Sequence, residues 1–332
     1  MSAPLDLMII GAGPAGLAAA IAAGQAGFSY KVLEKGVLVN SIFHFPRNMV
    51  FFTTPELLEI GGLPFVTPYE KPTRAEALRY YRRVADTYRI PICFGETVGL
   101  IARVPPQAGE AACFEIGSGI AGRGPSLHRA RHVILCTGYY DHPNRLGIPG
   151  EGLPHVHHYY SEPHGSYRKT AVVVGGKNSA AIAALELYRA GAAVTLVHRR
   201  DRLSDSIKYW IRPDIENRIR EGSIRACFDT RLVEILPESV VADRNGTTEE
   251  IRADDVFLLT GYHPDTSLMA RSGIAVHPET QAPDHDPKTL ETNVPGLFVA
   301  GSVVSGKETD RVFIENGKFH GEIIVSTILA RR

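Results

Sequence analysis

The sequence predicts an α/β fold in which a strand–turn–helix unit occurs twice. Two glycine-rich turns indicate this fold, because each lies between a short apolar run and an alanine-rich segment. The first is Gly11-Ala12-Gly13-Pro14-Ala15-Gly16 after residues 7–10, and the second is Gly175-Gly176-Lys177-Asn178-Ser179-Ala180 after residues 172–174. Short aliphatic runs are typical of buried parallel strands, and such a turn lets a pyrophosphate approach a helix N-terminus. We therefore expect two Rossmann-like dinucleotide-binding domains, the second inserted in the first.

The residues after the second strand of each unit distinguish the two turns. Glu34 ends its apolar run eighteen residues after Gly16, where an acid accepts hydrogen bonds from ribose hydroxyls. The corresponding run of the second unit ends in His198-Arg199-Arg200, without an acid. Guanidinium groups suit a 2′-phosphate, although they could also form a solvated basic strand end. The first site is interpreted as FAD or NAD and the second as NADPH, and two bound dinucleotides indicate electron transfer.

Composition excludes several other classes of function. The 332 residues contain 36 Lys plus Arg and 36 Asp plus Glu, a balance that indicates neither a nucleic-acid nor a membrane partner. No run of 18 apolar residues occurs, and the N-terminus lacks the basic segment of a signal peptide. The four cysteines form no CxxC pair, which indicates a reducing, cytoplasmic location. His155, His157 and His158 have metal-ligand spacing but no accompanying acid or cysteine cluster, so we expect no metal site.

Local patterns predict the elements of the first domain in order. Residues 17–26, which are rich in alanine, predict a helix, and residues 30–34 predict a buried strand. Residues 40–70, rich in Phe, Pro and Gly, predict a packed loop over a ligand. Residues 73–89 predict a helix with Thr73 as its N-cap and Glu76 three residues later. Strands are predicted by the apolar runs at 90–94, 100–104, 112–116 and 132–136.

The second domain and a return to the first follow. Residues 141–168, rich in Pro, His and Tyr, are interpreted as a linker, and helices are expected at 181–190 and 210–220. Leu258-Leu259-Thr260-Gly261-Tyr262 repeats the pattern Leu135-Cys136-Thr137-Gly138-Tyr139, which indicates duplicated domains. A strand at 296–301 and a closing helix at 312–330 complete the chain. The expected domains are 1–165 with 288–332 for FAD, and 166–287 for NADPH.

Candidate cofactor-binding residues lie in the two turns, at the neighbouring strand ends and in loops expected near the flavin. For the first site they are Gly11, Gly13, Pro14, Ala15, Gly16, Glu34, Lys35, Asn40, Ser41, His44, Thr53, Val98, Thr137, Gly138, Gly301, Ser302, Phe313 and Ile314. For the second they are Gly175, Gly176, Lys177, Asn178, Ser179, Ala180, His198, Arg199 and Arg200, and Gly261 and Tyr262 complete the set. Lys177 is expected either to reach a pyrophosphate or to point to solvent. Cys136 is expected to be a small buried residue.

Specific motifs show which flavoproteins the chain resembles. They are Asn40-Ser41-Ile42, Phe51-Phe52-Thr53-Thr54, Leu58-Glu59-Ile60-Gly61, Lys71-Pro72-Thr73-Arg74, Tyr80-Tyr81-Arg82, His158-Tyr159-Tyr160, Gly176-Lys177-Asn178-Ser179-Ala180, and the segment from Phe313 to Gly321. Over nearly the whole chain, the sequence resembles the bacillithiol-disulfide reductase family of thioredoxin-reductase-like flavoproteins. The resemblance implies FAD, NADPH, a homodimer or homotetramer, and reduction of a low-molecular-weight thiol disulfide.

Two positions depart from the pattern of that family. Members with a proposed catalytic cysteine carry it in the first turn as Gly-Pro-Cys-Gly, where this chain has Ala15. Flavoproteins of this broad class often end the last strand with an acid, where this chain has Ser302. Since a CxxC pair is also missing, the sequence identifies no catalytic residue.

The sequence is compatible with three hypotheses about what receives the electrons. The first is a small disulfide such as bacillithiol disulfide, which the reduced flavin would have to reduce directly or through a thiol that the sequence does not single out. The second is a small redox protein, ferredoxin or flavodoxin, as in ferredoxin–NADP reductases of thioredoxin-reductase-like fold. The third is a redox sensor, in which the state of the flavin controls a partner.

Overall fold

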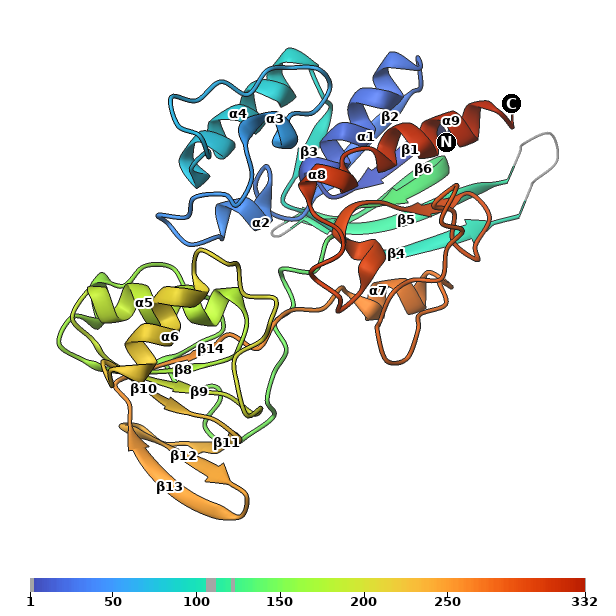
Figure 1. The fold of residues 1–332 in the computed structure, drawn as a ribbon. Helices are drawn as coiled ribbons and strands as arrows, with labels where there is room; N and C mark the ends of the chain where they lie inside the picture. Colours follow the sequence, from blue (N-terminus) through green and yellow to red (C-terminus); the bar gives the residue numbers. More distant parts are fainter. Residues whose placement is uncertain (1–2, 106–111, 121–122, 332) are drawn as a thin grey trace. The chain divides into compact units, whose positions relative to one another are not determined.

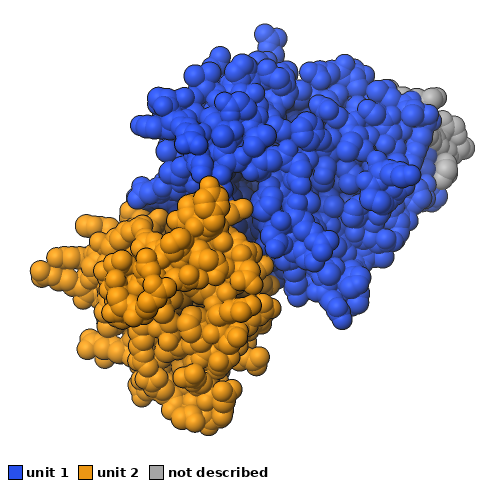
Figure 2. All heavy atoms as spheres, viewed as in Figure 1, with its two compact units in different colours: residues 1–142, 262–332 blue, residues 143–261 orange. Residues whose placement is uncertain are grey.

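The computed structural model describes residues 3–105, 112–120 and 123–331. The chain divides into two compact units, Met1–His142 with Tyr262–Arg332 (unit 1) and Pro143–Gly261 (unit 2). Figure 1 shows the course of the chain, and Figure 2 shows the two units in different colours. Unit 2 is therefore inserted between two segments that together build unit 1.

A mixed sheet forms the centre of unit 1. Among the described residues the strand order is β3-β2-β1-β6-β5-β4, with β15 also paired to β6. Strands β1, β2, β3 and β15 run parallel to their neighbours, whereas β4, β5 and β6 form antiparallel pairs. The bounds are β1 Leu5–Ile10, β2 Tyr30–Glu34, β3 Ile92–Phe94, β4 Glu96–Val104, β5 Cys113–Ile120, β6 Arg123–Leu135 and β15 Leu297–Val299. Because Ile10 lies in register with Leu135, the first glycine turn and Thr137-Gly138 meet at one sheet edge.

Helices cover this sheet. Their bounds are α1 Pro14–Gln25, α2 Asn40–Phe43, α3 Pro55–Leu58, α4 Arg74–Thr87, α7 Thr266–Arg271, α8 Ile314–Gly317 and α9 His320–Leu329, with a 3₁₀ turn, η2, at Gly301–Ser305. Helices α1 and α9 pack side by side (Figure 1), so closely that a Cβ on Gly321 would lie 2.4 Å from the Cα of Ala19. The predicted N-cap of α4 is confirmed, because Thr73 and Glu76 form a reciprocal capping box.

Unit 2 contains a parallel sheet and a smaller antiparallel one. The parallel sheet has the order β10-β9-β8-β14-β7 within the described chain, and β11-β12-β13 form the second sheet. The bounds are β7 Val156–His157, β8 Thr170–Val174, β9 Ala193–Val197, β10 Ile224–Cys227, β11 Thr230–Ile235, β12 Ser239–Arg244, β13 Thr247–Arg252 and β14 Asp255–Leu258. Helices α5 Asn178–Arg189 and α6 Arg212–Arg220 and a 3₁₀ turn, η1, at His164–Ser166 complete the unit.

Unit 2 begins and ends earlier in the chain than the predicted NADPH-binding domain, residues 166–287. Residues 143–165 belong to unit 2, because β7 pairs with β14 and Pro149 accepts a hydrogen bond from the Ile235 N–H at 2.9 Å. Residues after 261 belong to unit 1, where α7 packs on β4. These contacts join segments that lie far apart in sequence, so local composition does not reveal them.

Two segments contain more structure, or different structure, than their patterns predict. The predicted loop at 40–70 includes the short helices α2 and α3, and the predicted closing helix is two helices, α8 and α9. In the described part of the chain, no helix is both long and apolar enough to cross a membrane.

Candidate dinucleotide-binding sites

The two glycine turns have the same local geometry. Gly11 and Gly175 both have positive φ, 107° and 154°, a region that side chains rarely adopt. A Cβ on Gly11 would lie 2.5 Å from the carbonyl oxygen of Cys136, and a Cβ on Gly175 would lie 2.6 Å from that of Leu259. At both positions the backbone of the adjacent strand end therefore excludes any side chain.

The hydrogen bonds around each turn are also equivalent. The N–H groups of Cys136 and Leu259 each donate, at 2.8 Å, to the last residue of the strand that precedes the turn. The N–H of Gly11 donates to Leu33 at 2.8 Å, and the N–H of Gly175 donates to Val197 at 3.1 Å. The predicted sequence repeat thus corresponds to equivalent positions between parallel strands of the two sheets.

The two turns differ at their last position, which is Gly16 in the first and Ala180 in the second. A Cβ on Gly16 would lie only 2.0 Å from the carbonyl oxygen of Gly11, so α1 approaches β1 more closely than a side chain permits. The second turn has Ala180 at this place, and α5 accommodates its buried methyl group. The first helix therefore lies closer to its turn than the second does.

Gly13 differs from its neighbours, because no protein atom requires a glycine there. It has ordinary extended angles, φ −72° and ψ 175°, and a Cβ would meet no atom within 4 Å. The open space lies at the N-terminus of α1, where backbone N–H groups attract anions. These features fit a dinucleotide pyrophosphate.

Glu34 joins the first glycine turn to the segment after β2, with one carboxylate oxygen on each. Oε2 accepts from the Ala12 N–H and Oε1 from the Gly36 N–H, each at 2.8 Å, and the residue is only 5% exposed. Burial raises the pKa of Glu34, and the two backbone donors act in the opposite direction. Each oxygen keeps a further lone pair, so the carboxylate can still accept a ribose hydroxyl.

The loop after β6 contains a candidate residue, Asp141, that the sequence pattern did not single out. Asp141 forms an ion pair with Lys35 at 3.0 Å and accepts from the Asn40 amide at 3.4 Å. Residues 35, 40 and 141 are thereby brought together from two loops. No local pattern around Asp141 indicates this role, because its partners lie about a hundred residues away.

Gly301, just after the end of β15, lies against Ala15 of the first glycine turn. Its N–H donates to Nδ1 of His320 at 3.1 Å, and a Cβ on it would lie 2.7 Å from the Cβ of Ala15. A Cβ on Gly138 would lie 3.4 Å from the hydroxyl of Ser302. The structure thus brings Ala15, Gly138, Gly301 and Ser302 together, and it adds His320, whose only sequence signal was its place in the segment ending at Gly321.

Thr137 has a buried hydroxyl that makes no hydrogen bond to the described protein residues. Buried polar groups normally have partners, and Thr260, its equivalent in the repeat, donates to the carbonyl of Asn144 at 2.6 Å. An unpaired hydroxyl beside the first turn fits a bound polar ligand.

The other predicted first-site residues are placed less directly. Val98 lies in β4 with its side chain in the apolar core of unit 1, and only its backbone could meet a ligand. Phe313 precedes α8, where its N–H donates to the Asn316 side chain at 2.8 Å, and its ring is 47% exposed. Ser41 and His44 lie in or after α2, and Thr53 precedes α3; no described contact joins the three to the glycine turn.

The second site contains an imidazole above the glycine turn. A Cβ on Gly176 would lie 2.2 Å from Cε1 of His198, so only glycine fits under this ring. Its Nε2 is buried without a described partner. Burial, with the adjacent guanidinium groups of Arg200 and Arg199, lowers the pKa of His198. The ring is thus a neutral polar group facing the turn.

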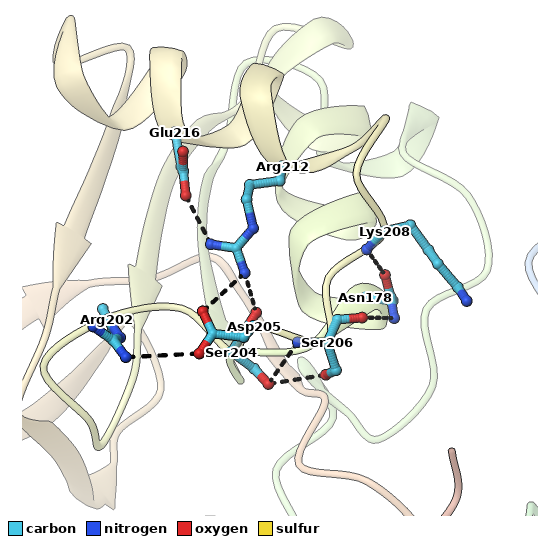
Figure 3. A network of polar contacts seen from close by, with 8 residues as sticks. All are labelled: Asn178, Arg202, Ser204, Asp205, Ser206, Lys208, Arg212 and Glu216. Carbon is cyan, nitrogen blue, oxygen red and sulfur yellow. Dashed lines mark hydrogen bonds and ion pairs between the residues drawn. The ribbon is translucent and has the colours of Figure 1, made fainter. Parts of the chain in front are cut away.

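Arg199 and Arg200 are exposed, and neither forms an ion pair with any residue that the structure describes. Lys177 and Ser179 are also exposed at the start of α5. Asn178 differs, because its side chain bonds the loop at 198–211 (Figure 3). Gly261 (φ 95°) ends unit 2, whereas Tyr262 belongs to unit 1 and packs 4.6 Å from the ring of Tyr140.

The chain's four cysteines, Cys93, Cys113, Cys136 and Cys227, are all free. Cys136 is buried beside the first turn, and burial raises the pKa of its thiol well above the usual value. A buried thiol with a raised pKa is a poor nucleophile.

Among the residues described, no three His, Cys, Asp or Glu side chains gather into a group that could hold a metal ion.

Comparison with known proteins agrees with two dinucleotide sites that serve one redox reaction. A family model described as pyridine nucleotide-disulphide oxidoreductase matches residues 8–301. The chain belongs to this family. It is 41% identical to the bacilliredoxin reductase Bdr of Bacillus subtilis (strain 168) over 326 residues, which cover 98% of this chain and 97% of the relative.

Solved structures of similar proteins extend this result. The bacillithiol disulfide reductase Bdr from Bacillus cereus is 38% identical with a TM-score of 0.95, and the match covers 99% of this chain and 100% of that one. The thioredoxin reductase of Lactococcus lactis, 22% identical with a TM-score of 0.76 and 98% of each chain covered, shows the fold alone.

Membership of the pyridine nucleotide-disulphide oxidoreductase family confirms the predicted class of enzyme, a flavin-dependent disulfide oxidoreductase. The predicted α/β fold, which resembles that of thioredoxin reductases, is also confirmed. The predicted cofactors, FAD and NADPH, agree with this family.

Proposed function

We propose that this protein is an NADPH-dependent FAD enzyme that reduces a low-molecular-weight thiol disulfide, such as bacillithiol disulfide. The observation that carries the proposal is the pair of equivalent turns, one followed by the buried Glu34 and the other by the exposed Arg199 and Arg200. An acid suits ribose hydroxyls and guanidinium groups suit a 2′-phosphate. The name of the Bacillus cereus relative supports the choice of acceptor.

FAD is assigned to unit 1. The Gly11–Gly16 turn would hold the pyrophosphate at the start of α1, and Glu34 would accept from a ribose hydroxyl. Thr137, Gly138, Gly301 and Ser302 meet at the same edge of the sheet, so they are assigned to the same cofactor. Bound FAD would supply two-electron chemistry between a nicotinamide and a disulfide.

NADPH is assigned to unit 2, with its pyrophosphate at the turn from Gly175 to Ala180 and its 2′-phosphate at Arg199 and Arg200. The neutral His198 ring lies above Gly176 and offers one unpaired nitrogen to this ligand. We further propose a homodimer or homotetramer in the cytoplasm, where four free cysteines stay reduced.

A small redox protein is the second candidate acceptor. The Bacillus subtilis relative is named a bacilliredoxin reductase, which points to a protein rather than a free disulfide. Ferredoxin and flavodoxin belong to the same class of acceptor. The two candidates share every assignment in units 1 and 2 and differ only in what receives the electrons.

The purified protein is expected to be yellow, with FAD released on heating, and to oxidise NADPH when bacillithiol disulfide is present. The reason is that both turns have the geometry of dinucleotide sites. The measurement is an absorbance scan followed by an NADPH-oxidation assay with bacillithiol disulfide, other small disulfides, bacilliredoxin, ferredoxin, flavodoxin and oxygen. A protein that binds no flavin, even after incubation with FAD, contradicts the whole proposal. If only a redox protein accepts the electrons, and no small disulfide does, the second candidate acceptor is correct.

Turnover is expected to survive replacement of any single cysteine by serine. Ala15 leaves the first turn without a thiol, and Cys136 is buried with a raised pKa. Cys136→Ser is the informative variant, and Cys113→Ser, also buried, is its matched control. Because a buried hydroxyl destabilises a core, FAD content and melting temperature must be compared first. A folded Cys136→Ser variant that accepts hydride from NADPH but cannot reduce the disulfide would make Cys136 the catalytic thiol.

A further inference from the structure

The side chain of Asn178 joins the second glycine turn to the loop that carries Arg199 and Arg200. This loop, residues 198–211, is called the arginine loop here, and it leads from the end of β9 to α6. Oδ1 of Asn178 accepts from the Lys208 N–H at 2.9 Å, and Nδ2 donates to the Ser206 carbonyl at 3.2 Å (Figure 3). The two bonds define the amide orientation, because a flipped amide would place donor against donor and acceptor against acceptor.

Other contacts hold the start and the middle of the arginine loop. At its start, His198 and Arg200 accept through their carbonyl groups from Thr230 and Asp229, at 3.0 and 2.9 Å. Near its middle, the Ser204 N–H donates to the Gly176 carbonyl at 2.9 Å. Of the residues that bond the arginine loop in these contacts, Gly176 and Asn178 belong to the second glycine turn.

A second group of polar side chains holds the loop to α6. The Arg212 guanidinium donates to the Ser204 carbonyl at 2.7 Å and to Glu216 at 2.9 Å, and it lies 3.5 Å from Asp205 (Figure 3). Asp205 also pairs with Arg202 at 3.6 Å. The arginine loop is therefore held to α6 by polar side chains, and the Asn178 side chain joins the loop to the second glycine turn.

We propose that Asn178 is a positioning residue that gives the enzyme its preference for NADPH over NADH, by holding the arginine loop in the conformation that receives the 2′-phosphate. The inference rests on the proposed NADPH site. NADPH and NADH differ only in the phosphate that meets Arg199 and Arg200. Because these side chains are exposed and unpaired in the described chain, the position of the loop backbone sets the region that their guanidinium groups can reach. A loosened loop would have to be ordered again on binding, which weakens the phosphate contact.

Asn178→Ala is expected to weaken binding of adenosine 2′,5′-bisphosphate about tenfold and that of 5′-AMP by less than about twofold, as for loss of one or two hydrogen bonds. Isothermal titration calorimetry on the intact protein measures both without any turnover. The ratio of kcat/KM for NADPH to that for NADH should fall in parallel. Equal weakening of both nucleotides would mean that Asn178 binds the 5′-phosphate directly, and unchanged binding would mean that it has no role; either result overturns the inference.

Controls separate this role from a loss of folding. Asn217→Ala removes an exposed side chain of α6 that bonds only Arg220 among the described residues, and it should leave both affinities unchanged. Hydrogen exchange at the Lys208 amide should accelerate in Asn178→Ala and not in Asn217→Ala. Asn178→Asp keeps an acceptor for that amide, so hydrogen exchange at Lys208 should be slower than in Asn178→Ala. A wild-type protein that binds the bisphosphate and 5′-AMP equally well would instead contradict the NADPH site itself.

Discussion

Gly13→Ala is expected to fold normally and to lose most of its FAD. A Cβ at Gly13 meets no protein atom within 4 Å, and its backbone angles are ones that alanine adopts. A methyl group there would occupy the space through which a pyrophosphate approaches the N-terminus of α1. Loss of one charge-assisted hydrogen bond to the backbone costs about 1.5–3 kcal/mol, or roughly 10- to 150-fold in affinity.

The measurement is the ratio of flavin to protein after purification, followed by titration of the apoprotein with FAD. The melting temperature of the apoprotein should equal that of wild-type apoprotein. Gly16→Ala is the matched comparison, because its Cβ would lie 2.0 Å from the Gly11 carbonyl oxygen and must displace α1 from β1. That variant is expected to lose folding stability as well as FAD. If Gly13→Ala retains full FAD affinity, no ligand approaches this part of the turn.

Replacing both Arg199 and Arg200 by alanine is expected to raise the KM for NADPH by roughly 10- to 150-fold and to leave the KM for NADH nearly unchanged. The range follows from about 1.5–3 kcal/mol for the loss of a guanidinium–phosphate interaction. Both side chains are exposed, and neither pairs with another described residue, so their removal costs the fold little. Steady-state kinetics with each coenzyme, using ferricyanide as the acceptor, makes the comparison independent of the natural acceptor.

Arg231→Ala provides the control for this double variant. Arg231 is an exposed arginine of β11 in the same unit, outside both glycine turns. It should change neither KM. Equal losses for NADPH and NADH in the Arg199 and Arg200 variant would show that these residues support the fold of unit 2 rather than the 2′-phosphate.

The geometry of the two turns could be predicted from the sequence because it depends on residues close together in the chain. A glycine with positive φ between a strand and a helix leaves a strong local signal, as at Gly11 and Gly175. The residue at the end of the next strand, Glu34 in one unit and Arg199 in the other, is the basis on which we propose different cofactors for the two turns. Family membership confirms the class of reaction that this pattern predicted.

The tertiary structure decided what depends on contacts between distant segments. It assigned residues 143–165 to unit 2 through the pairing of β7 with β14, and it brought Asp141 to Lys35 and His320 to Gly301. It also showed that Asn178, predicted as a cofactor-binding residue, uses its side chain to hold a loop thirty residues away. The sequence alone determined the position and backbone geometry of each glycine turn, because strand, glycine and helix signals are local. Only the fold could decide the partners of each side chain, because hydrogen bonds and strand pairing depend on distance in space.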